Sequence, residues 1–307
     1  MIFFMRKPGR ITLGWWNTSL SPKTKENQAT EEHKLYVAFV LFRLLNERWV
    51  DVLCLCEVTP DDIENISDAL GDEFKIYNGA FREKRKKFDI CIIYRMQIVE
   101  FLGSSLVSKP HHSGTTVYAG QKVEFNINET DETLVLFIAH WSSRLYDYAD
   151  SPNKAHLGMI LQSAVHECIT SRNNKVIVLG DFNEEPFNES ISHHLGASRD
   201  IALVKKKPGL LYNPFWRHMM YSALHPNSDT TFIHGGTYYY KNDDTSRWKT
   251  FDQMMFSSDF ISGNSWHLNE TETTVFSDSE FISYICSSKS KFDHLPILSV
   301  IERVQNG

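Results

Sequence analysis

The chain has 307 residues, of which 42% are hydrophobic, so it can bury a sizeable core and is expected to be globular. Its 38 acidic and 32 basic side chains give a formal charge of -6. This balance excludes a protein that attracts polyanions over its whole surface. A polyanionic ligand would therefore need a local basic patch or a metal ion.

Cysteine usage and hydropathy indicate an intracellular setting. The chain has five cysteines, and Cys54, Cys56 and Cys91 lie in apolar runs typical of strands, so we expect buried, reduced thiols. No stretch approaches the length that spans a bilayer, and the apolar residues 1–5 are too short for a signal sequence. These features predict a cytoplasmic protein that does not associate with membranes.

Hydrophobic patterning predicts strands alternating with helices. Strands are expected over residues 10–17, 50–58, 88–95, 96–103, 115–127, 133–141, 176–180, 251–258 and 295–302. Helices are expected within residues 24–49, where Leu35, Phe39 and Phe42 recur at helical spacing, and over residues 60–70 and 152–172. A charged loop is expected at 82–87, and long loops with short strands at 205–250. No repeat or composition break divides the chain, so we expect one domain over residues 1–307.

Several predicted strands end on polar side chains. Asn17, Glu57, His140 and Asp181 stand at the ends of four strands, and Asp252 stands at the start of another. Strand ends can meet at one edge of a sheet, where loops place chemical groups on a rigid scaffold. We therefore expect these side chains to share a site, although Asn and Asp also end strands where they have no function.

Short motifs occur in a characteristic order along the chain. They are WN at 16–17, CEV at 56–58, AHWSS at 139–143, GDFN at 180–183, GTY at 236–238, FDQMMFSS at 251–258 and FDHLPIL at 292–298. With this order the chain resembles the endonuclease/exonuclease/phosphatase superfamily over about residues 10–302. The resemblance implies an α/β fold: a four-layer α/β sandwich, with two mixed β-sheets packed face to face and helices outside. It also implies hydrolysis of a phosphate ester with a divalent cation, Mg²⁺ or Mn²⁺.

The resemblance assigns the metal shell to Asn17, Glu57 and Asp293. A phosphodiester is anionic, so a hard cation helps to neutralise its oxygens before water can attack. Carboxylate and amide oxygens are suitable ligands for such a cation.

Five residues match positions that the superfamily uses in catalysis. Asp181 and Asn183 match the GD-x-N pair that orients the attacking water and contacts the phosphate. His294 matches the catalytic histidine, and Asp252 matches the carboxylate that holds such an imidazole in one tautomer. His140 matches a second histidine that donates to a phosphoryl oxygen. Whether His294 or Asp181 takes the proton from water stays open at this stage.

The chain also departs from the superfamily pattern. Thr250 and Phe292 stand where an arginine and a serine are frequent. The tyrosine that abasic-site endonucleases place over the phosphate and the cysteine-containing signature of inositol 5-phosphatases have no clear match. Deoxyribonuclease I pairs its first histidine with a glutamate; Asp89 lies near the corresponding position but out of register, and it stays unassigned.

Three residues are expected to contact substrate. Arg144 is either a phosphate clamp or a solvated loop arginine, and Trp216 and Tyr238 belong to the aromatic-rich stretch 210–248. Aromatic rings beside a phosphate site can stack bases, although rings under a long loop also serve as packing. The basic runs at 82–87 and 205–207 either contact phosphates or are solvated.

These features predict a divalent-metal-dependent phosphodiesterase, a nuclease that hydrolyses DNA or RNA by in-line attack of an activated water. The first alternative is a phosphatase acting on a small phosphorylated molecule or nucleotide. The second is a binding module that keeps the fold without turnover, and the complete catalytic set argues against it.

Overall fold

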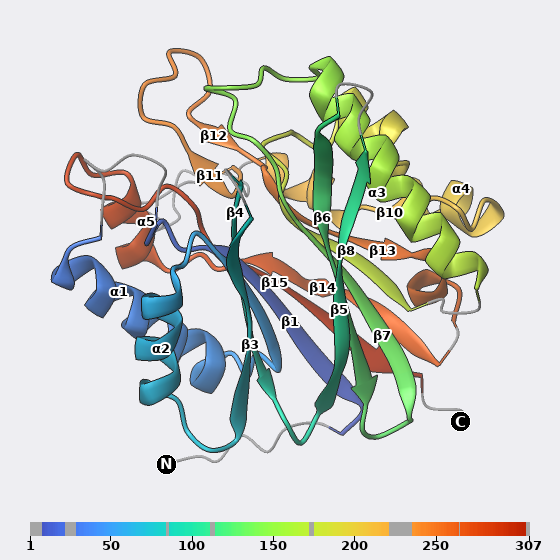
Figure 1. Ribbon diagram of the computed structural model, residues 1–307, viewed down its shortest axis with the longest axis horizontal. Helices are drawn as coiled ribbons and strands as arrows, with labels where there is room; N and C mark the ends of the chain where they lie inside the picture. The colour runs from blue at the N-terminus through green and yellow to red at the C-terminus, as the bar shows by residue number, and fades with distance from the viewer. Residues whose placement is uncertain are drawn as a thin grey trace, which may run out of the picture.

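Two large β-sheets form the centre of the computed structural model (Figure 1). The structure describes residues 8–21, 29–83, 86–110, 114–171, 175–220, 235–263 and 265–304, with only the backbone at 81–83, 86 and 87. The six-stranded sheet has the order β14-β15-β1-β2-β4-β3 and the seven-stranded sheet the order β5-β6-β7-β8-β13-β10-β9. Each sheet contains parallel and antiparallel pairs. In the six-stranded sheet β1 is parallel to β2 and antiparallel to β15, and in the seven-stranded sheet β7 is parallel to β8 and antiparallel to β6.

The strands of the six-stranded sheet are β1 (Arg10–Asn17), β2 (Val52–Cys56), β3 (Phe74–Glu83), β4 (Lys86–Arg95), β14 (Trp266–Val275) and β15 (Ile297–Arg303). Those of the seven-stranded sheet are β5 (Val99–Pro110), β6 (Thr116–Ile127), β7 (Glu132–His140), β8 (Val176–Asp181), β9 (Ala197–Ser198), β10 (Leu211–Tyr212) and β13 (Asp252–Ser257). A separate pair is formed by β11 (Tyr238–Tyr239) and β12 (Trp248–Lys249).

Helices cover the outer faces of the two sheets. They are α1 (Glu31–Phe42), α2 (Pro60–Ala69), α3 (Pro152–Thr170), α4 (Ile201–Lys206) and α5 (Ser279–Ile285), with short turns η2 (Arg43–Glu47), η3 (Ser190–His194), η4 (Pro214–Met219) and η5 (Ser258–Ile261). In Figure 1, α1 and α2 lie at the left beside the six-stranded sheet, and α3 and α4 lie at the right beside the seven-stranded sheet. The predicted four-layer sandwich is thereby confirmed.

Two hydrophobic clusters hold these layers together. The larger contains buried residues of both sheets together with those of α1 and α5, and the smaller joins α3 to the outer face of the seven-stranded sheet. Every residue of β2 and β8 is buried. Strands covered on both faces read as continuous apolar runs rather than alternating ones, which is why these two were predicted from sequence. Cys54, Cys56 and Cys91 are buried and unpaired, as predicted.

Local sequence explains where the helices begin. Thr59 accepts a hydrogen bond from the amide of Asp62, whose carboxylate accepts one from the amide of Thr59, and Pro60 occupies the first turn of α2. Ser151 caps α3 by accepting a hydrogen bond from the amide of Lys154, and Pro152 follows it. These caps fix the ends of two loops that follow strands β2 and β7.

Some predictions about local structure were wrong. The charged run 82–87 was expected to be a loop, but β3 continues to Glu83 and β4 begins at Lys86, because the two strands pair along their whole lengths. The helix expected within residues 24–49 is present as α1, with Val37 and Val40 buried and Leu35 and Phe39 exposed. Strand β14 and helix α5 were not predicted.

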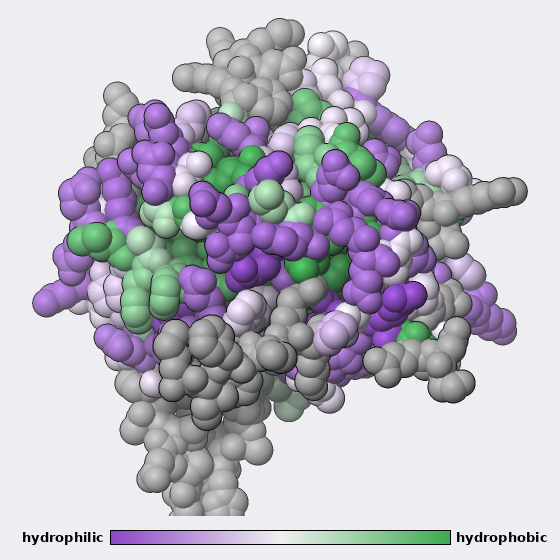
Figure 2. Space-filling model, turned by 90° about the horizontal axis from the view of Figure 1, so that it is seen from below, coloured by the Kyte–Doolittle hydropathy of each residue, from purple (hydrophilic) through white to green (hydrophobic). Residues whose placement is uncertain are grey.

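The surface away from β11 and β12 is mainly hydrophilic. Figure 2 shows the molecule from below, with small hydrophobic areas separated by hydrophilic residues. Within the described part of the chain, no helix combines the length and apolar character needed to cross a membrane.

Candidate active site

Strand register alone brings the predicted polar side chains together at one edge of each sheet. In the seven-stranded sheet, Asp181 at the end of β8 lies opposite both His140 of β7 and Asp252 of β13. In the six-stranded sheet, Asn17 at the end of β1 lies opposite Cys56, the residue before Glu57. The predicted convergence of strand ends is therefore present in the fold.

The side chain of Asn17 joins the two sheets. Its Nδ2 atom lies 3.3 Å from Oε1 of Glu57 and 3.3 Å from Oδ2 of Asp181. Its Oδ1 atom accepts a hydrogen bond from the amide of Ser19, and the Ser19 hydroxyl donates to Oδ1 of Asp293 at 3.0 Å. One amide side chain thus holds carboxylates from both sheets within one small volume.

A buried chain of hydrogen bonds orients His294. Its Nδ1 atom lies 2.7 Å from Oδ2 of Asp252, and Oδ1 of Asp252 accepts a hydrogen bond from Nε1 of Trp15, also at 2.7 Å. The opposite ring nitrogen, Nε2, is 3.6 Å from Oδ2 of Asp181. Burial opposes charge on His294, but Asp252 and Asp181 outweigh it and raise its pKa well above the usual value. The two carboxylates therefore favour the protonated form of the imidazole.

Trp15→Phe is expected to lower kcat by roughly 10-fold without unfolding the protein, because Asp252 loses the donor that fixes its carboxylate. Trp266→Phe is the matched control, since Trp266 is also buried and donates to a carboxylate, Oε2 of Glu132, remote from the catalytic side chains. Steady-state kinetics and thermal melts compare the two variants. Equal kcat values in the two variants would contradict a positioning role for Trp15.

Asp89 is a site residue that the sequence left unassigned. Its Oδ1 atom lies 3.2 Å from Nδ1 of His140, whose Nε2 is 3.8 Å from Oε1 of Glu57. Burial opposes protonation of His140, but the Asp89 carboxylate outweighs it and raises the pKa of His140 to about 9. The antiparallel pairing of β2 with β4, in which Leu55 lies opposite Cys91, brings Asp89 beside Glu57. That pairing is the signal that could have identified it.

Asp89→Asn is expected to lower the pKa of His140 from about 9 toward its ordinary value of 6.5. Because the pKa is raised on folding, the stability contributed by protonation is complete below about pH 6.5 and is lost as pH rises through 9. In the variant, the stability contributed by protonation of His140 should be lost at a lower pH than in the unsubstituted protein. NMR titration of the metal-free protein measures the change, with the other histidines as internal reference. An unchanged His140 midpoint would contradict the assignment.

Three residues of the site have left-handed backbone conformations that non-glycine residues seldom adopt. The φ angles are 51° at Ser19, 56° at Glu57 and 50° at Asn183. Such conformations persist where surrounding contacts enforce them, and they are frequent at functional sites. At Asn183 those contacts are a hydrogen bond from its amide to Oδ1 of Asp181 and one from its side chain to the carbonyl of Trp141.

The donor set suits a hard divalent cation. Oxygen atoms of Asn17, Glu57 and Asp293 are the ligand types that Mg²⁺ and Mn²⁺ prefer. Burial raises the pKa of Glu57, and a cation at this carboxylate would compensate the cost of its negative charge. The Asp293 side chain remains 46% exposed and so stays accessible to an ion. The residues present therefore fit the metal that the superfamily resemblance implies.

A second group of potential ligands lies close by. Single ligand atoms of Asp181, Asp252 and His294 all lie within 4.8 Å of one another. In this group Nδ1 of His294 and Oδ2 of Asp252 are already hydrogen-bonded to each other. The arrangement is equally that of an acid–base relay.

The residues expected to contact substrate have different surroundings. Arg144 donates from Nε to the carbonyl of Asn183 at 2.9 Å, and its guanidinium lies over the ring of Phe251. The ring of Tyr238 lies 4.7 Å from that of His294 and stacks on Phe251. Both side chains therefore border the candidate catalytic residues.

Trp216 and the lysine run lie elsewhere. Among the described residues, the ring of Trp216 contacts Arg199 and Phe187 and no catalytic side chain. Lysines 205 and 206 end α4, which lies on the far right in Figure 1, whereas β11 and β12 lie at the upper left. This position does not support the expectation that the run at 205–207 borders the site.

The fold is that of a known class. The chain belongs to the Endonuclease/Exonuclease/phosphatase family, whose model matches residues 17–294. The fold of this family implies a phosphoester hydrolase. Comparison with curated protein sequences gives no significant match.

Solved structures share the fold at low sequence identity. The human Nocturnin catalytic domain with bound sulfate has a TM-score of 0.59 at 13% identity, covering 96% of this chain and 95% of that chain. D. rerio TDP2 complexed with single-strand DNA product gives 0.56 at 14% identity, covering 95% and 99%. A mannosyl-6-phosphatase of Bacteroides thetaiotaomicron gives 0.58 at 16% identity, covering 96% and 100%.

Proposed function

We propose that the protein is a divalent-metal-dependent phosphodiesterase that hydrolyses nucleic acid. The observation that carries this proposal is that a set of oxygen donors and a His–Asp pair lie next to each other, with Asn17 and Asp181 between them. The hard oxygen donors Glu57 and Asp293 lie on one side, and the His294–Asp252 pair lies on the other. Hydrolysis of a phosphodiester requires a site for a cation beside a group that activates water.

In this proposal Asn17, Glu57 and Asp293 hold the cation, which neutralises the phosphoryl oxygens when it is bound. The oxygen of the attacking water bonds to phosphorus as the ester P–O bond breaks, and the leaving oxygen takes up a proton from solvent. Asp181 accepts the proton that the water loses, and its carboxylate is held in position by the Asn17 amide and lies 3.6 Å from Nε2 of His294. His294 carries a proton on Nε2 and donates to a phosphoryl oxygen as negative charge develops there.

Two further members of the catalytic set, His140 and Asp252, act beside this pair. His140 is protonated through Asp89, so it can donate to a second phosphoryl oxygen. Asp252 holds His294 in a single orientation through the hydrogen bond at Nδ1.

Aromatic side chains beside the site support a polymeric nucleic-acid substrate. Tyr238 borders His294, and the loop that follows Arg144 carries exposed side chains of Leu145, Tyr146 and Tyr148. In Figure 1 this loop, between β7 and α3, rises at the top of the molecule. Exposed rings beside a phosphate site can stack unpaired bases. Stacking does not require a positively charged protein, so it is compatible with the negative overall charge of this chain.

Hydrolysis of a phosphomonoester is the second candidate. It is favoured by the structural similarity to the mannosyl-6-phosphatase, which is as close as the similarity to the DNA-bound TDP2. A small phosphorylated sugar would not require the exposed tyrosines.

A substrate panel separates the two candidates. Labelled single-stranded DNA, duplex DNA, RNA and a sugar monophosphate are each incubated with the protein and Mg²⁺ or Mn²⁺, at low and high salt. We expect cleavage of a polymer that weakens as salt rises, because phosphate contacts are lost. Release of inorganic phosphate from the sugar, with every polymer intact, would replace the diesterase proposal with the phosphatase.

A further inference from the structure

One buried lysine, on helix α3, contacts the backbone of the GDFN segment (residues 180–183). Lys154, in the first turn of α3, has no exposed side-chain surface. Its Nζ atom donates to the carbonyl oxygens of Phe182 and Asn183, each at 3.2 Å, and lies 3.4 Å from Oε1 of Glu184. A buried ammonium is costly and needs both a counter-charge and hydrogen-bond acceptors, and here the acceptors belong to the active-site segment.

The segment that Lys154 holds is the one that sets the geometry of Asp181. Asn183 follows in the left-handed conformation, and its amide donates to Oδ1 of Asp181. The carbonyl of Asn183 accepts a second hydrogen bond, from Nε of Arg144. Two cationic side chains therefore hold one carbonyl group, and a left-handed residue held in this way keeps its side chain in a single direction.

We propose that Lys154 is a positioning residue: its ammonium holds the carbonyls of Phe182 and Asn183, so that Asp181 and Asn183 face the reacting phosphate. The inference rests on the proposed hydrolase function of the site. Lys154 touches neither substrate nor metal and acts through the backbone. A purely structural role, in which the ion pair with Glu184 only stabilises the fold, is the alternative that the experiment must separate.

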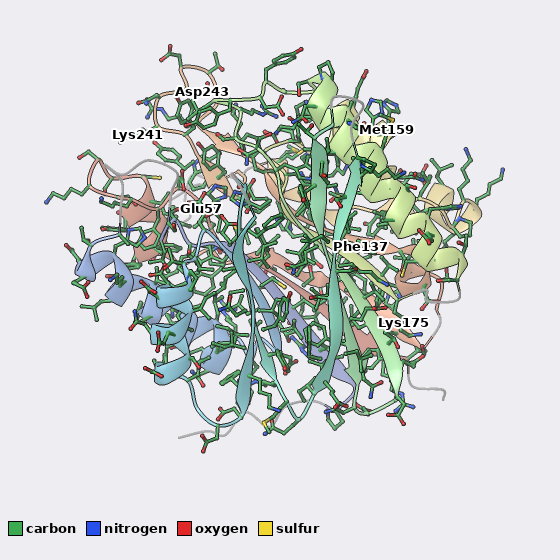
Figure 3. All side chains as sticks on the ribbon, viewed as in Figure 1. Glu57, Phe137, Met159, Lys175, Lys241 and Asp243 are labelled. Atoms are coloured by element: carbon green, nitrogen blue, oxygen red, sulfur yellow. The ribbon has the colours of Figure 1, made fainter. Side chains whose placement is uncertain are left out.

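Lys154→Met tests the proposal, with Lys175→Met as the matched control. Lys175 precedes β8 and pairs with Glu132 and Asp259 at the other end of that strand, so its loss also removes a shielded ion pair beside β8. Figure 3 shows Lys175 at the lower right and Glu57 at the upper left. We expect Lys154→Met to lower kcat about 100-fold with KM changed less than about threefold, and Lys175→Met to keep kcat within about twofold.

Removing one member of a buried pair can prevent folding, since it leaves Glu184 with an uncompensated charge. The double variant Lys154→Met with Glu184→Gln removes both charges, while the amide oxygen of the new side chain can still accept from Ser190 and the amide of Asp150. It should fold and show the same loss of kcat. A double variant that folds with the kcat of the unsubstituted protein would overturn the proposal.

Hydrogen exchange provides a readout that does not depend on turnover. In the unsubstituted protein the amide of Phe182 donates to the carbonyl of Phe251, and that of Asn183 donates to Asp181. Both amides should exchange faster in the double variant while those within β8 stay unchanged. Unchanged exchange at Phe182 and Asn183 would overturn the positioning role. If the unsubstituted protein hydrolyses no phosphate ester, the proposed function fails, and the exchange experiment still decides the role of Lys154.

Discussion

Asp181→Asn should lower kcat by at least about 10³-fold and leave the protein folded, because the amide cannot accept the proton of the attacking water. The variant keeps an oxygen for the amide of Asn183, so the backbone of the segment is retained. A loss of activity in Asp181→Asn is therefore due to the missing negative charge and proton acceptor, and not to a change in the backbone. The measurement is kcat on a phosphodiester beside a thermal melt.

Asp51→Asn is the control for this substitution. Asp51 is a buried carboxylate immediately before β2, at the opposite end of that strand from Glu57, and it accepts a hydrogen bond from the amide of Thr12. The control should change stability but not kcat. Equal losses of kcat in both variants, or full activity in Asp181→Asn, would contradict the assignment of Asp181.

Glu57→Gln is expected to abolish the stabilisation of the protein by Mg²⁺. A ligand present at 100 times its Kd stabilises a folded protein by about 2.7 kcal/mol, which raises the melting temperature of a large domain by several degrees. Glu57 supplies a charged ligand to the proposed metal shell, and glutamine keeps its shape without the charge. Melting curves with and without Mg²⁺ measure the effect, and isothermal titration calorimetry gives the Kd directly.

Glu73→Gln is the control for the metal experiment. Glu73 lies just before β3 and pairs with Arg95, near the opposite end of the six-stranded sheet from Glu57. It should keep the full Mg²⁺-dependent shift. A shift of equal size in Glu57→Gln would remove Glu57 from the metal shell.

Much of the fold could be predicted because strands buried on both faces leave clear apolar runs, as in β2 and β8. The polar residues at the ends of these strands, Glu57 and Asp181, could therefore be identified as candidate site residues. Strand register places Asp181 opposite His140 and Asp252. Strand β14 was missed because Thr and Glu occupy many of its positions, and its burial depends on pairing with β15. The charged run after β3 was assigned to a loop because composition does not report the pairing of β3 with β4.

The supporting residues of the site could not be predicted in the same way. Trp15 and Asp89 act through partners that are far away in sequence, Asp252 and His140. Lys154 lies in a helix whose pattern gives no sign that one lysine points inward. Such roles arise from tertiary packing, and only the folded arrangement reveals them.

We propose that this site hydrolyses a phosphodiester with the help of a divalent cation. The most direct test follows p-nitrophenolate release from thymidine 5′-(p-nitrophenyl phosphate), with Mg²⁺ or with a chelator, by the unsubstituted protein and by Asp181→Asn. We expect release that requires both Mg²⁺ and Asp181. Release that continues in the chelator, or that is undiminished in Asp181→Asn, would contradict it.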